Sequence, residues 1–322
     1  MHRVLPLVLA GILANTAFAL PEWQHYDLSL QYCRAAGLPE MFCSRVATES
    51  HNTDALEFDD LAAHAQSFPE QNLCEAADAT LLRIHSLSSE VARALEKTDA
   101  SAAAAALGRS LHTIQDNCAH HGMTNPEHAW YTLSDVCQKT SLSPDVAPEA
   151  LPCAQADTEA AVSAFVEALG SLGVPPDLLA STSQVKKKKA GYTSQCDFLA
   201  EAKTWDGQDK VWDRDKMRAP LLHALTAGLL GGPLGDSVCA SGPEAIATTP
   251  APTVDTSHGT PSCLKVHLYC LGKADSLEEE PEVTPEAGSG CSMTSRHNAA
   301  WGSSLLMLVM LLAALGRPRR QA

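Results

Sequence analysis

The chain has 322 residues and a mass of 34.1 kDa, enough for one large domain with a substantial core or for two smaller ones. The formal net charge is −15 and aromatic residues make up only 5% of the sequence, which argues against a broad basic surface that wraps nucleic acid. Much of the 45% hydrophobic share is Ala and Leu, so the composition favours helices over a β-rich sheet.

The first 19 residues predict a secretory signal. "MHRVLPLVLAGILANTAFA" has a basic residue before a short apolar run and ends in an A-x-A cleavage pattern. Export would place the 11 cysteines in a compartment where disulfides persist. Cys291 lies in the C-terminal tail, and the other ten allow up to five bridges. The pairs closest in sequence, which are the first to test, are Cys33 with Cys43 and Cys263 with Cys270.

Residues 20–236 predict an all-α domain with several helices. Five segments have helical patterns, and no convincing alternating strand lies among them. The first ends at stop signals, Gly37 and then Pro39. The predicted helices cover residues 26–37, 75–97, 99–121, 158–173 and 217–230.

The remainder of the chain predicts no further core. Residues 237–290 are rich in Pro and Thr and then acidic, which is typical of an extended linker. In the tail, 291–322, 18 uncharged residues precede "RPRRQA", a pattern that predicts a transmembrane helix with its Arg cluster in the cytoplasm. With Cys291 in "GSGCSM", this tail resembles the MYXO-CTERM sorting tail of myxobacterial exported proteins. That resemblance implies cleavage near Cys291 and attachment at the cell surface, whereas a plain membrane anchor is the alternative.

The helix expected over residues 99–121 carries the strongest chemical signal. His112, Asp116 and His120 are spaced four residues apart, so each is turned by about 40° from the last and all three share one stripe. Imidazole and carboxylate groups in this register suit Zn²⁺, and a buried carboxylate needs a cation or strong hydrogen bonds to compensate its charge. We therefore predict a metal site here. His121 is turned about 100° from His120 and falls outside the set.

Further candidate ligands lie upstream, and their order carries a resemblance. His25 follows Trp23, and Asp54 and His64 come next, with His51, Asp59 and Asp60 as competitors. This order, leading into "LHTIQDNCAHHGM", resembles the zinc-dependent phospholipase C and single-strand nuclease superfamily, in the branch whose helix reads approximately HTxQDxxAH. Members are all-helical exported hydrolases with a three-zinc site.

The resemblance implies ligand roles for these residues. Asp54, His64, His112 and Asp116 would hold one Zn²⁺, and Asp116 would bridge to a second one that His25 approaches. His120 would serve the remaining ion. The later His-x-x-x-Glu pair of the family has no counterpart, so His128 is our candidate for the missing ligand, and we expect two or three ions. Asp54 and Asp116 would act in catalysis through water bound at the metals.

We accordingly expect a surface-anchored, zinc-dependent phosphodiesterase that hydrolyses phospholipid head groups. A negative chain does not exclude a phosphodiester substrate, because metal ions supply positive charge locally. A nuclease for single-stranded nucleic acid is one alternative, disfavoured by the few aromatic residues available for base stacking. A non-catalytic, metal-binding helical module is the other. Lys186–Lys189 would contact phosphate or anionic lipid, or form a solvated loop.

Overall fold

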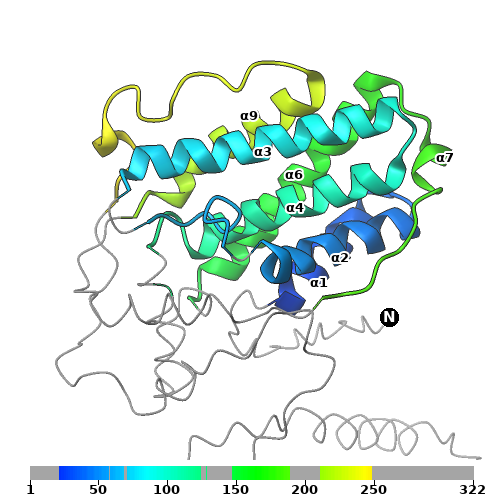
Figure 1. Ribbon diagram of the computed structural model, residues 1–322, viewed down its shortest axis with the longest axis horizontal. Helices are drawn as coiled ribbons and strands as arrows, with labels where there is room; N and C mark the ends of the chain where they lie inside the picture. The colour runs from blue at the N-terminus through cyan, green and yellow to red at the C-terminus, as the bar shows by residue number, and fades with distance from the viewer. Residues whose placement is uncertain are drawn as a thin grey trace, which may run out of the picture. The chain divides into compact units, whose positions relative to one another are not determined.

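The computed structural model describes residues 22–57, 59–68, 71–124, 128, 147–188 and 211–248. Within these ranges the chain forms seven α-helices and no strand, which confirms the all-α prediction (Figure 1). No helix of this part is long and apolar enough to cross a membrane. The predicted signal at residues 1–19, the linker from residue 249 onward and the C-terminal tail lie outside the described residues.

Five of the helices correspond to the predicted ones, although α6 begins at residue 150 rather than 158. A sixth, α2, was not predicted. The helices are α1 (Glu22–Ala35), α2 (Glu40–Leu56), α3 (Leu73–Glu96), α4 (Ala100–Ala119), α6 (Ala150–Leu172), α7 (Pro176–Leu179) and α9 (Arg214–Leu230), and a short 3-10 helix, η2 (Pro243–Ala245), follows them.

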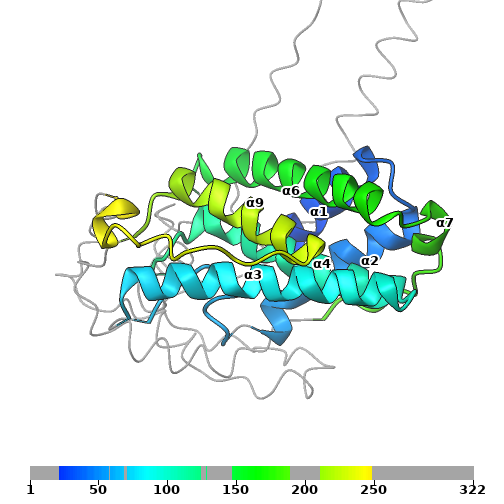
Figure 2. The ribbon, with the colours of Figure 1, turned by 90° about the horizontal axis from the view of Figure 1, so that it is seen from above.

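Helix α4 is the central helix, and it packs against α1, α2, α3, α6 and α9 (Figures 1 and 2). Asp99 fixes its start, because the Asp99 carboxylate accepts a hydrogen bond from the Ala102 N–H at 2.9 Å. The Ala-rich first half of α4 is buried among its neighbours with little side-chain bulk. The second half buries polar side chains instead, and those exposed by 1% or less are Ser110, His112, Thr113, Gln115, Asp116 and Asn117.

Gly108 determines how closely α2 approaches α4. A Cβ atom at this position would lie 2.9 Å from the Glu49 Cβ, 3.0 Å from the Ser50 nitrogen and closer still to the Val46 carbonyl. Gly108 is one helical turn before His112, and the opposing helix carries Asp54. The absence of a side chain at Gly108 therefore helps to bring the two predicted ligands together.

We expect Gly108→Ala to lower the free energy of unfolding by about 1–3 kcal/mol, because α2 must move away from α4 to admit the methyl group. Urea denaturation measures this change. The matched control is Gly170→Ala in α6, where a Cβ meets nothing within 4 Å. It should be neutral or stabilising by up to about 1 kcal/mol through helix propensity. Equal effects at the two positions would contradict the close-approach role of Gly108.

Three disulfides connect the helices. Cys33–Cys43 links the end of α1 to α2 and confirms one of the two predicted pairs. The second and third bridges are Cys74–Cys239 and Cys118–Cys153, and they join the start of α3 to the segment after α9 and the end of α4 to the start of α6. Cys263 and Cys270 lie outside the described residues. Disulfides of this kind persist in oxidising compartments.

The packed domain continues past Asp236, where we expected an extended linker to begin. The Val238 N–H donates to the Asp78 carboxylate at 3.2 Å, and the Asp213 N–H donates to the Ile246 carbonyl at 2.7 Å. Ile246 is only 3% exposed. Residues 237–248 thus belong to the helical domain. Composition alone could not show this, because the disulfide that holds the segment joins cysteines 165 residues apart.

Candidate metal centre

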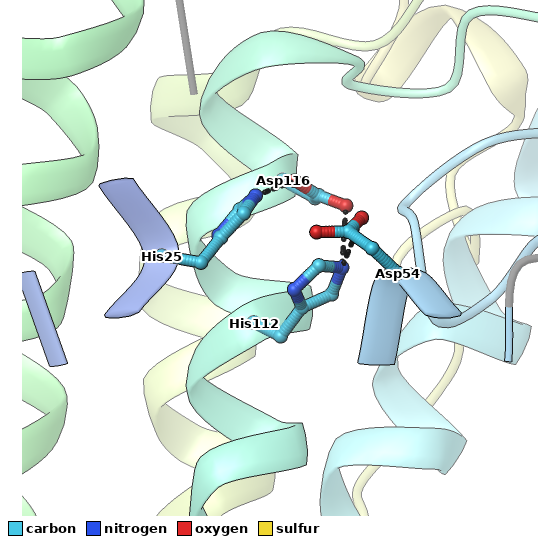
Figure 3. A group of neighbouring side chains, drawn as sticks. All are labelled: His25, Asp54, His112 and Asp116. Carbon is cyan, nitrogen blue, oxygen red and sulfur yellow. Dashed lines mark ion pairs between the residues drawn. The ribbon is translucent and has the colours of Figure 1, made fainter. Parts of the chain in front are cut away.

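Four of the predicted ligands meet in the interior of the domain. Donor atoms of His25, Asp54, His112 and Asp116 all lie within 4.8 Å of one another, and Figure 3 shows the four side chains pointing toward a common region. His25 comes from α1, Asp54 from α2, and the other two from successive turns of α4. We call these four residues the metal cluster, because such a group can hold a metal ion.

Asp116 makes the most contacts in the cluster. Its Oδ1 lies 3.2 Å from the His25 Nε2, and its Oδ2 lies 3.0 Å from the His112 Nε2 and 3.0 Å from the His64 Nδ1. Every ion-pair partner of Asp116 among the described residues is a histidine. Burial by itself raises the pKa of Asp116, but His112, His120 and His25 together hold that pKa well below its ordinary value.

The pKa values of His25 and His112, two of the histidines beside Asp116, are shifted in opposite directions. Burial lowers the pKa of His25, but Asp116 and Asp54 outweigh it and raise that pKa to about 9. Burial also lowers the pKa of His112, and repulsion from His25 adds to the effect, so that this pKa stays below its ordinary value despite Asp116. In the metal-free protein, His25 therefore holds a proton against Asp116 while His112 remains neutral.

His64, on the loop after α2, lies directly beside the metal cluster. Its Nδ1 lies 3.2 Å from the His112 Nε2 and 3.9 Å from the Asp54 Oδ1, and its outer Nε2 lies 3.2 Å from the Glu57 carbonyl oxygen. Two ring nitrogens that face each other at this distance need a proton or a cation between them.

The donor set fits a bound cation. Asp54 Oδ2 and His112 Nδ1 are buried and have no hydrogen-bond partner in the described part of the chain. Two carboxylates and three imidazoles directed at one buried region match the ligands that divalent transition metals prefer in proteins.

His120 and His128 border the cluster. Helix α4 ends at Ala119, and His120 caps it in helical conformation, with its N–H donating to the Asp116 carbonyl at 2.7 Å. The His120 Nδ1 lies 2.8 Å from the His64 carbonyl oxygen and 3.6 Å from the Asp116 Oδ2. The His128 ring packs edge-on against the His120 ring, with centroids 4.3 Å apart. These two predicted ligands therefore form an outer layer on one side of Asp116.

The competing candidates are directed elsewhere. The His51 Nε2 lies 3.1 Å from the Lys188 carbonyl, and the Asp60 carboxylate pairs with Arg83. Asp59 is exposed. The His121 Nδ1 donates to the Trp212 carbonyl at 2.8 Å, which agrees with the prediction that His121 lies outside the set.

Arg83 of α3 holds the loop that carries His64. Its guanidinium pairs with the carboxylates of Glu57 and Asp60, and Arg109 of α4 pairs with the same Glu57. The Arg83 side chain is 9% exposed and that of Glu57 19%, whereas that of Asp60 is 43% exposed, so only the Arg83–Glu57 pair is largely shielded from water. The loop between α2 and His64 is thus fastened to two helices.

Gln115 is a site residue that the sequence reasoning did not single out. Its Oε1 lies 2.7 Å from the His25 Nδ1, and its Nε2 donates to the hydroxyls of Ser29 at 3.1 Å and Thr158 at 3.0 Å. An amide oxygen only accepts hydrogen bonds, so the His25 Nδ1 keeps its proton and the Nε2 faces Asp116. Its place directly before Asp116 in the HTxQDxxAH pattern is the one sequence signal for this role.

We expect Gln115→Met, which removes the amide but keeps the side-chain length, to weaken metal binding by about 10- to 100-fold, because His25 loses the partner that fixes its ring. Gln115→Glu keeps an acceptor for the His25 Nδ1 and should recover most of that loss. Competition with a chromophoric chelator measures the affinities, and ¹⁵N chemical shifts of the His25 ring in the metal-free proteins above pH 9, where the ring is neutral, report the tautomer. A tautomer that is the same in all three proteins would contradict the assignment.

Comparisons of the chain with protein-family models, with curated proteins and with solved structures find no match. The function must therefore be inferred from the geometry of the cluster and from the residues that form it.

Proposed function

We propose that the protein is a zinc-dependent phosphodiesterase of phospholipase C type that acts on phospholipid head groups. One observation supports this most directly. Three helices bring Asp54 and Asp116 together with His25 and His112 in one largely buried cluster. Borderline-soft Zn²⁺ suits a mixed set of imidazole and carboxylate ligands. These residues follow one another along the chain in the order that resembles the zinc-dependent phospholipase C and single-strand nuclease superfamily.

Each residue has a defined task in this proposal. When bound, zinc would supply Lewis acidity toward a phosphoryl oxygen and toward water. Asp116 holds the rings of His25, His64 and His112 in a fixed arrangement. The Asp54 side chain is 23% exposed, whereas those of His112 and Asp116 are exposed by 2% or less, so solvent reaches the cluster from the Asp54 side. Asp54 is thus the group positioned to accept a proton from an attacking water.

We also propose that the domain works outside the cytoplasm, at the cell surface. The three disulfides are consistent with an oxidising compartment. The predicted signal and the MYXO-CTERM-like tail would provide export and attachment.

The experiment combines metal content with turnover. The purified protein should contain zinc by elemental analysis and hydrolyse bis(p-nitrophenyl) phosphate, lose that activity on dialysis against a chelator, and regain it when zinc is returned. Phosphatidylcholine vesicles and single-stranded DNA, offered separately, distinguish the phospholipase from the nuclease. A protein without zinc, or with turnover that the chelator leaves unchanged, would refute the proposal.

The depth of the cluster supports a second candidate, a non-catalytic metal-binding module. His25, His112 and Asp116 are each at most 1% exposed, which is typical of closed, structural metal sites. Under this alternative the chelator should lower the melting temperature, and no phosphodiester should be turned over before or after zinc is returned.

A further inference from the structure

Residues 183–188 form an extended segment that runs along α2, seen in green after α7 in Figure 1. We call this segment the basic strap, because it ends in Lys186–Lys188. Hydrogen bonds to α2 and to Ser101 of α4 hold its first half. The Arg45 Nη1 donates to the Ser183 carbonyl at 3.2 Å, and the Gln184 Nε2 donates to the Met41 carbonyl at 2.6 Å.

Asn52 of α2 fixes the lysine end of the strap. Its Nδ2 donates to the Lys186 carbonyl at 3.2 Å, and its Oδ1 accepts from the Lys188 N–H at 2.7 Å. Asn52 is only 3% exposed and lies two residues before Asp54. A buried amide that bonds both ends of a three-lysine run sets the backbone register of that run at the end of α2 that carries Asp54.

The same lysines reach α1. The Lys187 Nζ lies over the Tyr26 ring, 3.3 Å from its centroid, and Tyr26 directly follows His25. A cation in this position is attracted by the negative face of the ring. The basic strap therefore places positive charge next to α1 and α2, the helices that bring His25 and Asp54 to the metal cluster.

These lysines are not used in ion pairs within the described residues, although the chain has 38 acidic side chains and only 23 basic ones. Lys186, Lys187 and Lys188 are all exposed. In so acidic a chain, three exposed cations that have no acidic partner among the described residues leave their charge available to a ligand. They lie toward the end of α2 that carries Asp54, a ligand of the metal cluster, so an anion is the ligand that fits.

We propose that the basic strap is a subsite for the phosphate group of the substrate, beside the metal cluster. This inference rests on the proposed function for the identity of that substrate. Positive charge near a metal site raises the local concentration of anions and orients them toward it. The strap would thus position a phosphodiester without touching the reacting atoms.

The test uses the zinc-loaded full chain and inorganic phosphate as the probe, titrated by calorimetry at low ionic strength. The variant replaces all three lysines with glutamine, as K186Q/K187Q/K188Q. The control variant is R93Q/K97Q/K216Q. It removes three exposed cations, two at the C-terminal end of α3 and one in α9, and none of them forms an ion pair in the described part of the chain. We expect the strap variant to bind phosphate about tenfold more weakly, and the control to stay within about twofold of wild type.

A second arm separates the sources of phosphate. Vesicles of phosphatidylglycerol and phosphatidylcholine replace inorganic phosphate in a sedimentation assay. Weaker binding of the strap variant than of the control in either arm supports the subsite, and the arm with the larger loss identifies a free or a lipid-borne phosphate. Equal binding by the two variants in both arms would overturn it.

Asn52→Ala tests whether the placement of the lysines matters. It keeps every lysine but removes the two hydrogen bonds that set their register, so we expect a several-fold loss of phosphate affinity with unchanged zinc content. Wild-type affinity in this variant would overturn the role of the ordered strap. These titrations measure binding, so they test the subsite independently of turnover. Absence of phosphodiester hydrolysis would refute the proposed function but would leave the result for the subsite unchanged.

Discussion

Asp116→Asn is expected to abolish stoichiometric metal binding and reduce phosphodiester turnover to background. The substitution keeps the shape of the side chain but removes the negative charge that His25, His64 and His112 share. Loss of a hydrogen-bonding partner outside the ligand set of a metal typically costs about 10- to 100-fold in affinity, so loss of the central ligand should cost more than about a hundredfold. Elemental analysis after dialysis and turnover of bis(p-nitrophenyl) phosphate measure the two effects.

The control for this variant is Asp27→Asn. Asp27 is exposed on α1, the helix that carries His25, so its replacement removes the same charge outside the cluster. It should leave zinc content and turnover unchanged. Circular dichroism and the melting temperature verify that both variants remain folded. Full zinc occupancy in Asp116→Asn would show that the cluster is not the metal site.

Zinc affinity should rise with pH until about pH 9. In the metal-free protein the pKa of His25 is raised to about 9, so at neutral pH its ring carries the extra proton against Asp116. Zinc can bind the Nε2 only after that proton leaves. Each pH unit below the pKa should therefore weaken apparent binding about tenfold, or about a hundredfold between pH 9 and pH 7.

Calorimetry in buffers of different ionisation enthalpy measures this linkage, and close to one proton should be released from His25 for each zinc bound at pH 7.5. The metal-free protein should show the opposite trend in stability. Because the pKa of His25 is raised on folding, its contribution is complete below pH 6.5 and is lost as the pH rises through 9. His25→Gln should flatten both dependences, and a zinc affinity independent of pH from 7 to 9 in the wild type would contradict the assignment.

The helices that could be predicted are those whose apolar residues recur with helical spacing. Helix α2 lacks that pattern because its buried side includes polar residues, among them Ser50, His51, Asn52 and Thr53. Ser50 faces Gln115, and Asn52 holds the basic strap. A helix that buries polar groups for the site and for the strap looks like a polar loop when only its own segment is considered.

In the metal cluster, contacts within one helix could be predicted from the sequence, whereas contacts between helices could not. His112 and Asp116 were correctly placed side by side, because helical spacing is a local property. The same spacing places His120 beside Asp116, with its Nδ1 3.6 Å from the Asp116 Oδ2, but that Nδ1 also lies 2.8 Å from the His64 carbonyl oxygen, so His120 borders the cluster. Gln115 could not be assigned its role, because its partners Ser29 and Thr158 belong to α1 and α6.

By itself, the sequence determined the all-helical class, the stripe of His112 and Asp116, and the close Cys33–Cys43 pair, because these depend on residues within a few turns of one another. Only the tertiary structure decided that His25, Asp54 and His64 complete the cluster, that Asn52 holds the basic strap beside it, and that Cys239 returns to Cys74. These contacts join segments tens to more than a hundred residues apart, and the packing of other helices around α4 brings them together.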